Sequence, residues 1–106
     1  MSDWTPVGER TQVDPITPLA VAVGGVAIGI YEVDGVLHAI EDICPHAQAR
    51  LSEGFVDGCE IECPMHAAVF DVTTGRHLRG EPCRDVQRYP VRIVGNRIEV
   101  RAEALA

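Results

Sequence analysis

The sequence predicts a small all-β domain, and two observations support that fold class. Short runs of apolar residues with a period of two alternate with turn-forming dipeptides along much of the chain. Long apolar patterns with the 3.6-residue period of a helix are missing, and proline recurs too often for long helices. Short strands at this spacing are typical of stacked antiparallel sheets or a small barrel.

Three hairpins are predicted, each at a turn dipeptide between two short apolar runs: residues 21–28 around Gly24-Gly25, residues 30–40 around Asp34-Gly35, and residues 91–101 around Gly95-Asn96. Gly-Gly and Asp-Gly supply the positive φ angles that tight hairpin turns require. The third hairpin alternates apolar and charged residues, so we expect one buried face and one solvated face. A short turn or helix is expected at residues 102–106.

A length of 106 residues allows one domain, and no linker or repeat divides it, so we expect a single domain over residues 1–106. The chain has 16 acidic and 9 basic residues, a net charge of −7. This balance argues against nucleic-acid binding. A negative net charge suits electrostatic attraction toward a basic partner, although a contribution to solubility alone explains the charge equally well.

No membrane segment or targeting signal is expected. The longest uncharged stretch, residues 15–31, contains two prolines and a Gly-Gly pair and is a poor membrane span. The N-terminus lacks the basic and apolar pattern of a signal peptide. We therefore expect a cytoplasmic protein. Because disulfides are rare in the cytoplasm, we expect its four cysteines to bind a metal or take part in catalysis and not to form disulfides.

Two motifs between the second and third hairpins are typical of metal binding. They are Cys44-Pro45-His46 and Cys63-Pro64-Met65-His66, with sixteen residues between His46 and Cys63. Each motif offers one thiolate and one imidazole from a short loop. Two ligands of each type suit either a tetrahedral zinc site or a [2Fe–2S] cluster with two Cys on one iron and two His on the other. The ligand count does not separate these alternatives, but zinc fingers normally place both Cys before both His.

The paired motifs and their flanks resemble the Rieske [2Fe–2S] ferredoxins over nearly the whole chain. The matching flanks are Leu51-Ser52-Glu53-Gly54, Phe70-Asp71-Val72-Thr73-Thr74-Gly75, Gly80-Glu81-Pro82 and Tyr89-Pro90-Val91. The resemblance implies the Rieske fold: small stacked antiparallel sheets, with a cluster-binding subdomain of two loops, about residues 42–71, inserted between strands. It implies that Cys44 and Cys63 hold the inner iron, and that His46 and His66 hold the outer iron.

The resemblance also indicates which kind of Rieske protein this is. The high-potential proteins of respiratory complexes carry a disulfide at positions that here are Ala49 and Met65. They also use a Ser and a Tyr as hydrogen-bond donors at positions that here are Ala68 and Phe70. Because such donors stabilise the reduced state, their loss predicts a low reduction potential.

These features imply an electron carrier and not an enzyme, because every ligand position of such a cluster is filled. The expected role is the ferredoxin of an aromatic-ring-hydroxylating dioxygenase system, in aromatic hydrocarbon catabolism. It would take electrons from an NAD(P)H-dependent flavin reductase and deliver them to the terminal oxygenase, with His46, His66 and Pro82 at the docking tip. The alternatives are the Rieske-like small subunit of a nitrite reductase, many of which lack the ligands, and a zinc-stabilised structural module.

Other residues receive simpler interpretations. Cys59 is expected on a strand as a small buried hydrophobic residue. Cys83 is expected near the cluster without binding it, and His77 in solvent. Trp4 is expected to pack and hold the first strand. Ala67 stands where many family members have glycine, which predicts a small shift of that loop.

Overall fold

The computed structural model describes residues 3–45 and 48–105 and confirms the all-β class. All strand pairs in its three sheets are antiparallel. The first sheet has the order β1 (Thr5–Glu9), β11 (Arg97–Val100), β10 (Val91–Val94). The second has the order β2 (Leu19–Val23), β3 (Val26–Val33), β4 (Val36–Glu41), β9 (Arg88–Tyr89). The third has the order β5 (Phe55–Asp57), β6 (Glu60–Glu62), β7 (Val69–Asp71), β8 (His77–Arg79).

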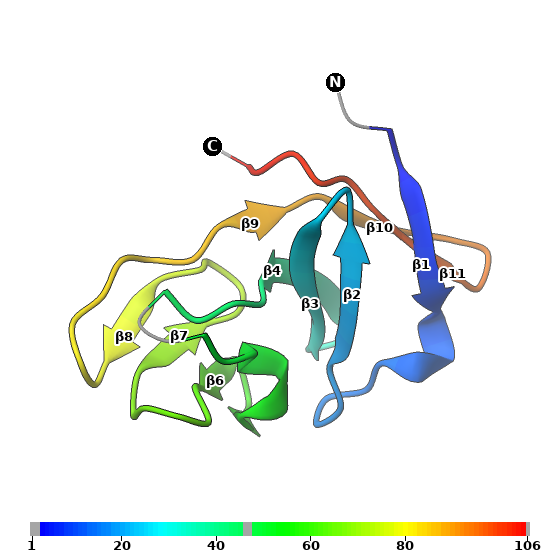
Figure 1. Ribbon diagram of the computed structural model, residues 1–106. Helices are drawn as coiled ribbons and strands as arrows, with labels where there is room; N and C mark the ends of the chain where they lie inside the picture. The colour runs from blue at the N-terminus through cyan, green and yellow to red at the C-terminus, as the bar shows by residue number, and fades with distance from the viewer. Residues whose placement is uncertain (1–2, 46–47, 106) are drawn as a thin grey trace.

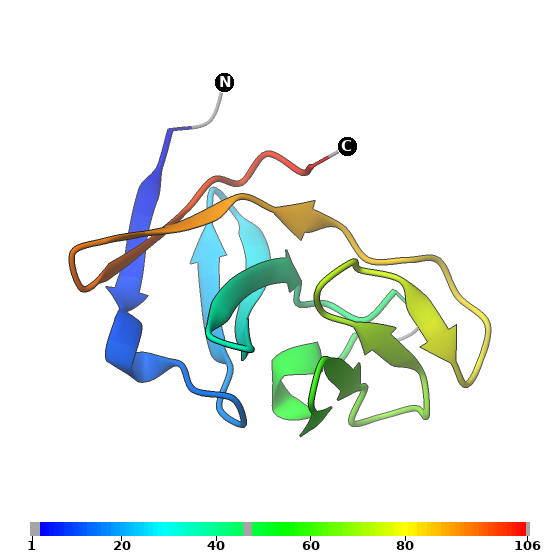
Figure 2. The same cartoon turned by 180° about the vertical axis from the view of Figure 1, so that it is seen from behind.

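The three sheets lie along the length of the molecule. Both ribbon views place the first sheet at one end, β2 to β4 in the middle and the third sheet at the other end (Figures 1 and 2). Two short 3-10 helices complete the fold: η1 (Arg10–Gln12) after β1, and η2 (Leu51–Glu53) before β5. Within the described residues, the structure contains no helix of the length and apolarity that a membrane crossing needs.

The first two predicted hairpins are confirmed and share one strand. Gly24 and Gly25 have φ angles of 56° and 81°, and Asp34 and Gly35 have 52° and 79°. These left-handed conformations close two-residue turns, as expected of Gly-Gly and Asp-Gly. The sequence suggested separate strands around Gly29, but residues 26–33 form the single strand β3.

The third hairpin is also present, but its predicted solvated face is partly covered. β11 is the central strand of the first sheet, between β1 and β10. Glu99 on β11 is 5% exposed, and its carboxylate accepts hydrogen bonds from Arg92 and Arg97. Trp4 holds the start of the chain to this sheet as predicted, because its ring lies 4.2 Å from the Arg92 guanidinium and 5.5 Å from that of Arg101.

The C-terminal segment forms bends, so the helix alternative for residues 102–106 is wrong for the part that the structure describes, residues 102–105. The Leu105 N–H donates to the Arg88 carbonyl at 2.7 Å, which fixes the segment beside β9.

The hydrophobic core consists of two clusters. One joins the first and second sheets and includes Ile28, Ile30 and Ile98. The other joins the second sheet to the third and includes Ile40 and Phe70. The second cluster also contains two of the predicted ligands, so the candidate centre is built into the packing between two sheets.

Candidate metal centre

The two cysteine motifs occupy matching loops. The first loop lies between Ile43 and Arg50, which form an isolated antiparallel bridge, and the second connects β6 to β7. The N–H of Cys44 donates to the Ala49 carbonyl at 2.9 Å, and the N–H of Cys63 donates to the Ala68 carbonyl at 2.9 Å. In both loops the bond joins a cysteine to the fifth residue after it. The backbone therefore holds each cysteine at an equivalent position in its loop.

The fold brings the two predicted thiol ligands into one buried cluster. Cys44 is 2% exposed and Cys63 is 1% exposed, and neither forms a disulfide; both lie in the core that also contains Leu51, Ile61 and Phe70. Buried cysteines outside disulfides, at matched loop positions, suit soft metal centres such as an iron–sulfur cluster. The residues present therefore fit such a group.

The two predicted histidine ligands have different outcomes. His46 lies outside the described residues. The His66 side chain is 34% exposed, and its Nδ1 lies 3.3 Å from a carboxylate oxygen of Glu81. Among residues 3–45 and 48–105, no three Cys, His, Asp or Glu side chains gather as ligands of one metal ion. Of the predicted ligands, Cys44 and Cys63 share a core cluster, while His66 lies at the surface of the second loop.

A buried carboxylate that the sequence did not reveal supports the first loop. Asp42 is fully buried two residues before Cys44, and its Oδ1 accepts the Ser52 N–H at 2.8 Å. Its Oδ2 accepts the Ser52 hydroxyl at 2.8 Å and the Arg50 guanidinium at 3.3 Å. Charge-assisted hydrogen bonds of this kind are strong. They fix the chain that returns from the loop against the chain that enters it.

Tyr31 lies close to this carboxylate. Burial raises the pKa of the Tyr31 hydroxyl, and the charge of Asp42 raises it further. Within the part of the chain that the structure describes, this hydroxyl has no hydrogen-bond partner. Tyr31 belongs to the same core cluster as Cys44 and Cys63, and its raised pKa keeps it a neutral phenol at pH 7.

The segment after β8 covers the second loop through a contact that only glycine permits. Gly80 has a φ of 90°, and a Cβ there would lie 2.1 Å from the Ala67 carbonyl oxygen. This contact brings the backbone just before Glu81 against the loop that carries His66. Gly80 and Glu81 therefore lie against the second loop, and the role of the Gly80-Glu81-Pro82 segment as a cover of the cluster stays a prediction.

Three of the simpler interpretations can now be judged. The prediction for Cys59 was wrong, because this residue lies in the turn between β5 and β6 and is half-buried. The prediction for His77 was also wrong: it is half-buried, with its ring edge-on to Phe70 at 5.5 Å between centroids. Cys83 is half-buried and packs against the core cluster of Cys44 and Cys63.

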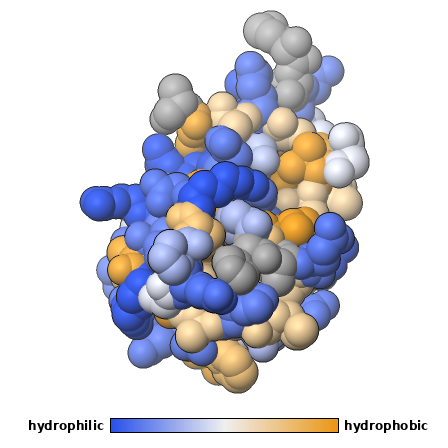
Figure 3. Space-filling view, turned by 60° about the vertical axis from the view of Figure 1, so that its left-hand side comes forward, coloured by the Kyte–Doolittle hydropathy of each residue, from blue (hydrophilic) through white to orange (hydrophobic). Residues whose placement is uncertain are grey.

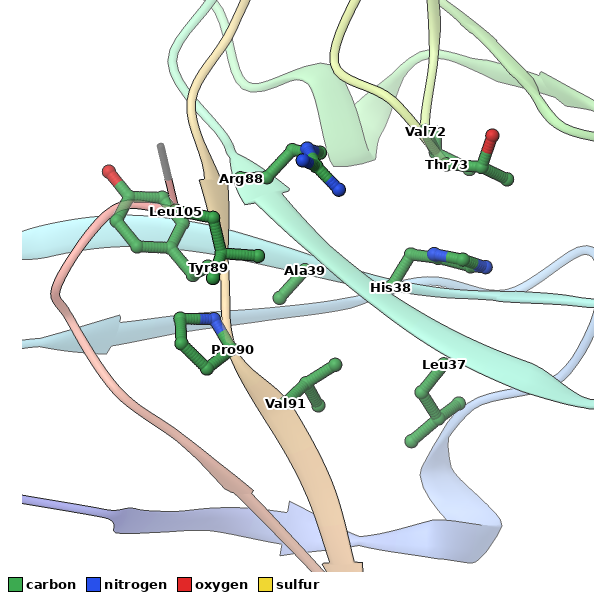
Figure 4. A pocket seen from close by; sticks show the side chains of 10 residues that line it. All are labelled: Leu37, His38, Ala39, Val72, Thr73, Arg88, Tyr89, Pro90, Val91 and Leu105. Atoms are coloured by element: carbon green, nitrogen blue, oxygen red, sulfur yellow. The ribbon is translucent and has the colours of Figure 1, made fainter.

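A separate pocket lies where β4 and β9 face the turn after β7. It has a volume of about 220 Å³, and its lining includes His38, Thr73 and Arg88 (Figure 4). Burial lowers the pKa of His38, which favours the neutral ring at pH 7. The described ligand candidates Cys44, Cys63 and His66 do not line this pocket, so the cysteine centre is a different site.

The fold and the two loops define a class: a β-sheet protein with two buried thiols, one on each of two matching loops, in the core between two of its sheets. Comparison with known proteins gives the family. The model of the Rieske [2Fe-2S] domain matches residues 3–90. The chain therefore belongs to the Rieske [2Fe–2S] domain family, and its cofactor is a Rieske [2Fe–2S] cluster.

Individual relatives agree with this assignment. The chain is 44% identical over 82 residues to the ferredoxin component of the naphthalene 1,2-dioxygenase system of Pseudomonas aeruginosa, covering 77% of this chain and 79% of that relative. It is 37% identical over 101 residues to the anthranilate 1,2-dioxygenase ferredoxin subunit of Burkholderia cepacia, covering 94% and 93%. A solved complex of reduced oxygenase and oxidized ferredoxin in carbazole 1,9a-dioxygenase contains a chain with a TM-score of 0.88 and 33% identity, covering 97% of this chain and 96% of that one.

Proposed function

We propose that this protein is a ferredoxin that delivers single electrons to the terminal oxygenase of an aromatic-ring-hydroxylating dioxygenase system. It is an electron-transfer component and not a catalytic enzyme. Two buried cysteines in matching loops are the observation that carries the proposal, and relatives named as ferredoxin components support it. A bound Rieske cluster supplies reversible one-electron transfer.

The ligand assignments are part of the proposal. Cys44 and Cys63 would hold the inner iron, and their burial supports this role. His46 and His66 would hold the outer iron, and the partial exposure of His66 supports a position between the cluster and a partner. We keep the single domain of residues 1–106 and its subdomain of about residues 42–71 as predictions.

The reduction potential is proposed to be low. Ala68 and Phe70 are both fully buried, and neither side chain carries a hydrogen-bond donor. Donors to cluster sulfur raise the potential, so their absence at these two positions lowers it. A low potential suits electron flow from a flavin reductase that uses NAD(P)H, which we propose as the upstream partner, in the cytoplasm.

The surface near the second loop suits a transient partner. Met65 is 69% exposed beside Pro64, and the two residues line a shallow hollow together with Arg50 and Glu53. Seen from the end that holds β7 and β8, apolar patches are small and interspersed with hydrophilic ones (Figure 3). Electron-transfer encounters typically use small and weak interfaces, and such a mixed surface supports one.

An EPR spectrum of anaerobically purified protein after dithionite reduction tests the cofactor. We expect a rhombic signal with an average g below that of all-cysteine [2Fe–2S] proteins. His66→Ala should abolish this signal, whereas His77→Ala should keep it, because His77 packs on Phe70 and has no proposed metal role. Colourless protein with stoichiometric zinc would overturn the electron-carrier function in favour of the structural zinc module.

Stopped-flow mixing tests the partner. Reduced protein should be reoxidised by a purified terminal oxygenase of such a system at rates that saturate with oxygenase concentration. The catalytic subunit of a nitrite reductase, mixed with the reduced protein under the same conditions, serves as the comparison electron acceptor. Faster transfer to that subunit than to the oxygenase would favour the nitrite reductase alternative.

A further inference from the structure

The pocket between β4 and the segment of β9 and β10 contains an arginine without a counter-ion. Arg88 is half-buried, and within the described part of the chain its guanidinium forms no ion pair or hydrogen bond. The other half-buried arginines of that part differ: Arg10 lies 2.6 Å from a carboxylate oxygen of Glu32, and Arg101 lies 3.8 Å from one of Glu103. A charge that is partly removed from water without an opposite charge is unfavourable. An anion bound in the pocket would remove that cost.

The fold holds Arg88 in place at the wall of this pocket. A Cβ at Gly75 would lie 3.3 Å from Cγ of Arg88, so the side chain packs against the segment between β7 and β8. The Arg88 carbonyl accepts the Leu105 N–H at 2.7 Å, which fixes its backbone. The side chains of Arg88 and His38 extend from β9 and β4 toward the side of the pocket where Thr73 lies (Figure 4). Arg88 therefore presents its donors to the pocket from a supported position.

His38 supplies a second donor beside Arg88. Burial lowers the pKa of His38, while the charge of Asp71 raises it and the charge of Arg88 lowers it. His38 is therefore close to both charged groups, and a neutral imidazole still donates one N–H. The Thr73 hydroxyl adds no donor, because it donates to Oδ1 of Asp71 at 2.6 Å. The polar side of the pocket thus consists of one guanidinium and one imidazole.

The size and the remaining lining of the pocket restrict its ligand. The volume of about 220 Å³ is below the roughly 300–1,000 Å³ of pockets for drug-sized ligands, so the ligand is small. Much of the remaining lining is apolar and includes Leu37, Pro90, Val91 and Leu105. One guanidinium near the charge of Asp71 favours a singly charged anion over a phosphate dianion. A carboxylate also matches the planar guanidinium in bidentate geometry.

We propose that this pocket binds a small organic carboxylate, with its charged group on Arg88 and His38 and its apolar body against Val91 and Leu105. The proposed site is separate from the cysteine centre, whose described ligand candidates do not line the pocket. A ligand here contacts β4, β9 and the C-terminal segment together. It therefore stabilises the folded chain in proportion to its occupancy.

Isothermal titration calorimetry of the purified protein at pH 7 tests the site, with benzoate as the probe. We expect saturable binding to one site. Acetate lacks the apolar body and benzyl alcohol lacks the charge, so each should bind about tenfold more weakly or worse. Arg88→Gln should weaken benzoate binding at least about tenfold, because it removes the guanidinium and keeps the carbonyl that accepts the Leu105 N–H.

Arg76→Gln is the matched control for Arg88→Gln. Arg76 is exposed between β7 and β8 and does not line the pocket, so its loss removes the same charge from solvent. Benzoate affinity should change less than about twofold, since exposed charges are screened. Equal benzoate affinity in Arg88→Gln and wild type overturns the proposal, and so does the absence of saturable binding to the wild type.

Nuclear magnetic resonance of the ¹⁵N-labelled wild type locates the probe without a variant that must fold. Benzoate should shift the backbone amide signals of His38, Thr73, Val91 and Leu105. Shifts confined to other parts of the chain overturn the proposal even if benzoate binds. The Rieske EPR signal of the same sample tests the proposed function separately: its absence overturns the electron-carrier role, while the benzoate titration still decides the pocket.

Discussion

Replacement of Gly80 by alanine tests whether the covering segment holds the second loop in place. A Cβ at this position would lie 2.1 Å from the carbonyl oxygen of Ala67 and 2.6 Å from its carbonyl carbon. Both are backbone atoms, which cannot rotate away as the end of a flexible side chain can. The segment and the loop must therefore separate by more than an ångström to reach ordinary van der Waals contact.

The expected cost has two parts. Alanine at a φ of 90° pays a conformational penalty of about 1–2 kcal/mol. Forcing packed groups apart adds about 1–3 kcal/mol. Gly80→Ala should therefore lower the free energy of unfolding by about 3 kcal/mol. Because the displaced residues adjoin the bond between Cys63 and Ala68, the loop should also hold its iron less firmly.

Gly95→Ala is the matched control for this experiment. Gly95 also has a positive φ, 63°, but a Cβ there would meet nothing within 4 Å. It should pay only the conformational part, about 1–2 kcal/mol. Denaturant unfolding followed by circular dichroism gives the stability of each variant. Loss of visible absorbance in the presence of an iron chelator gives the rate of iron release.

The reasoning fails if Gly80→Ala and Gly95→Ala unfold at the same denaturant concentration and release iron at the same rate. That result would mean that the contact with Ala67 relaxes without cost and that the segment does not stabilise the loop.

Three further predictions concern other parts of the structure. Cys63→Ser should abolish iron binding, whereas Cys59→Ser, which changes a half-buried turn thiol, should leave iron content unchanged in a colorimetric assay. Asp42→Asn removes a buried charge that accepts three hydrogen bonds, so denaturant titration should show a loss of about 2 kcal/mol. The hydrogen bond from Arg92 holds the pKa of Glu99 below its ordinary value of 4.5. The stability that this carboxylate contributes is therefore present above that value and lost as the pH falls through the lower folded-state pKa. Below pH 4.5 the melting temperature of the wild type should fall more steeply than that of Glu99→Gln, and parallel curves would contradict this assignment.

The parts of the fold that depend on neighbouring residues were predictable. The turns at Gly24-Gly25 and Asp34-Gly35 follow from the positive φ angles that those residues tolerate, and both were found. The two cysteine motifs also predicted two loops from local features alone, because the short spacing of their residues and the proline in each restrict the chain there.

The rest depends on contacts between residues far apart in the sequence. The burial of Glu99 requires that β1 pair on the other side of β11, and no local pattern encodes that pairing. His77 appeared to belong in solvent because it follows a turn, yet the third sheet packs its ring on Phe70. The roles of Asp42 and Gly80 depend on other segments of the chain: Asp42 accepts a hydrogen bond from Ser52, and Gly80 packs against Ala67.

The separate attachment of the two loops has a consequence for how the chain resists unfolding. The first loop is anchored to the second sheet, where the Asp42 N–H donates to the Ala27 carbonyl at 3.0 Å, while Cys63 follows β6 of the third sheet. None of the four cysteines forms a disulfide, so a cluster held by Cys44 and Cys63 would be the cross-link between the two sheets. A cross-link that closes a loop of this length restricts the unfolded chain by roughly 3 kcal/mol, as a disulfide does. Cluster loading and resistance to unfolding are therefore coupled, because the cluster that binds Cys44 and Cys63 also links the second sheet to the third.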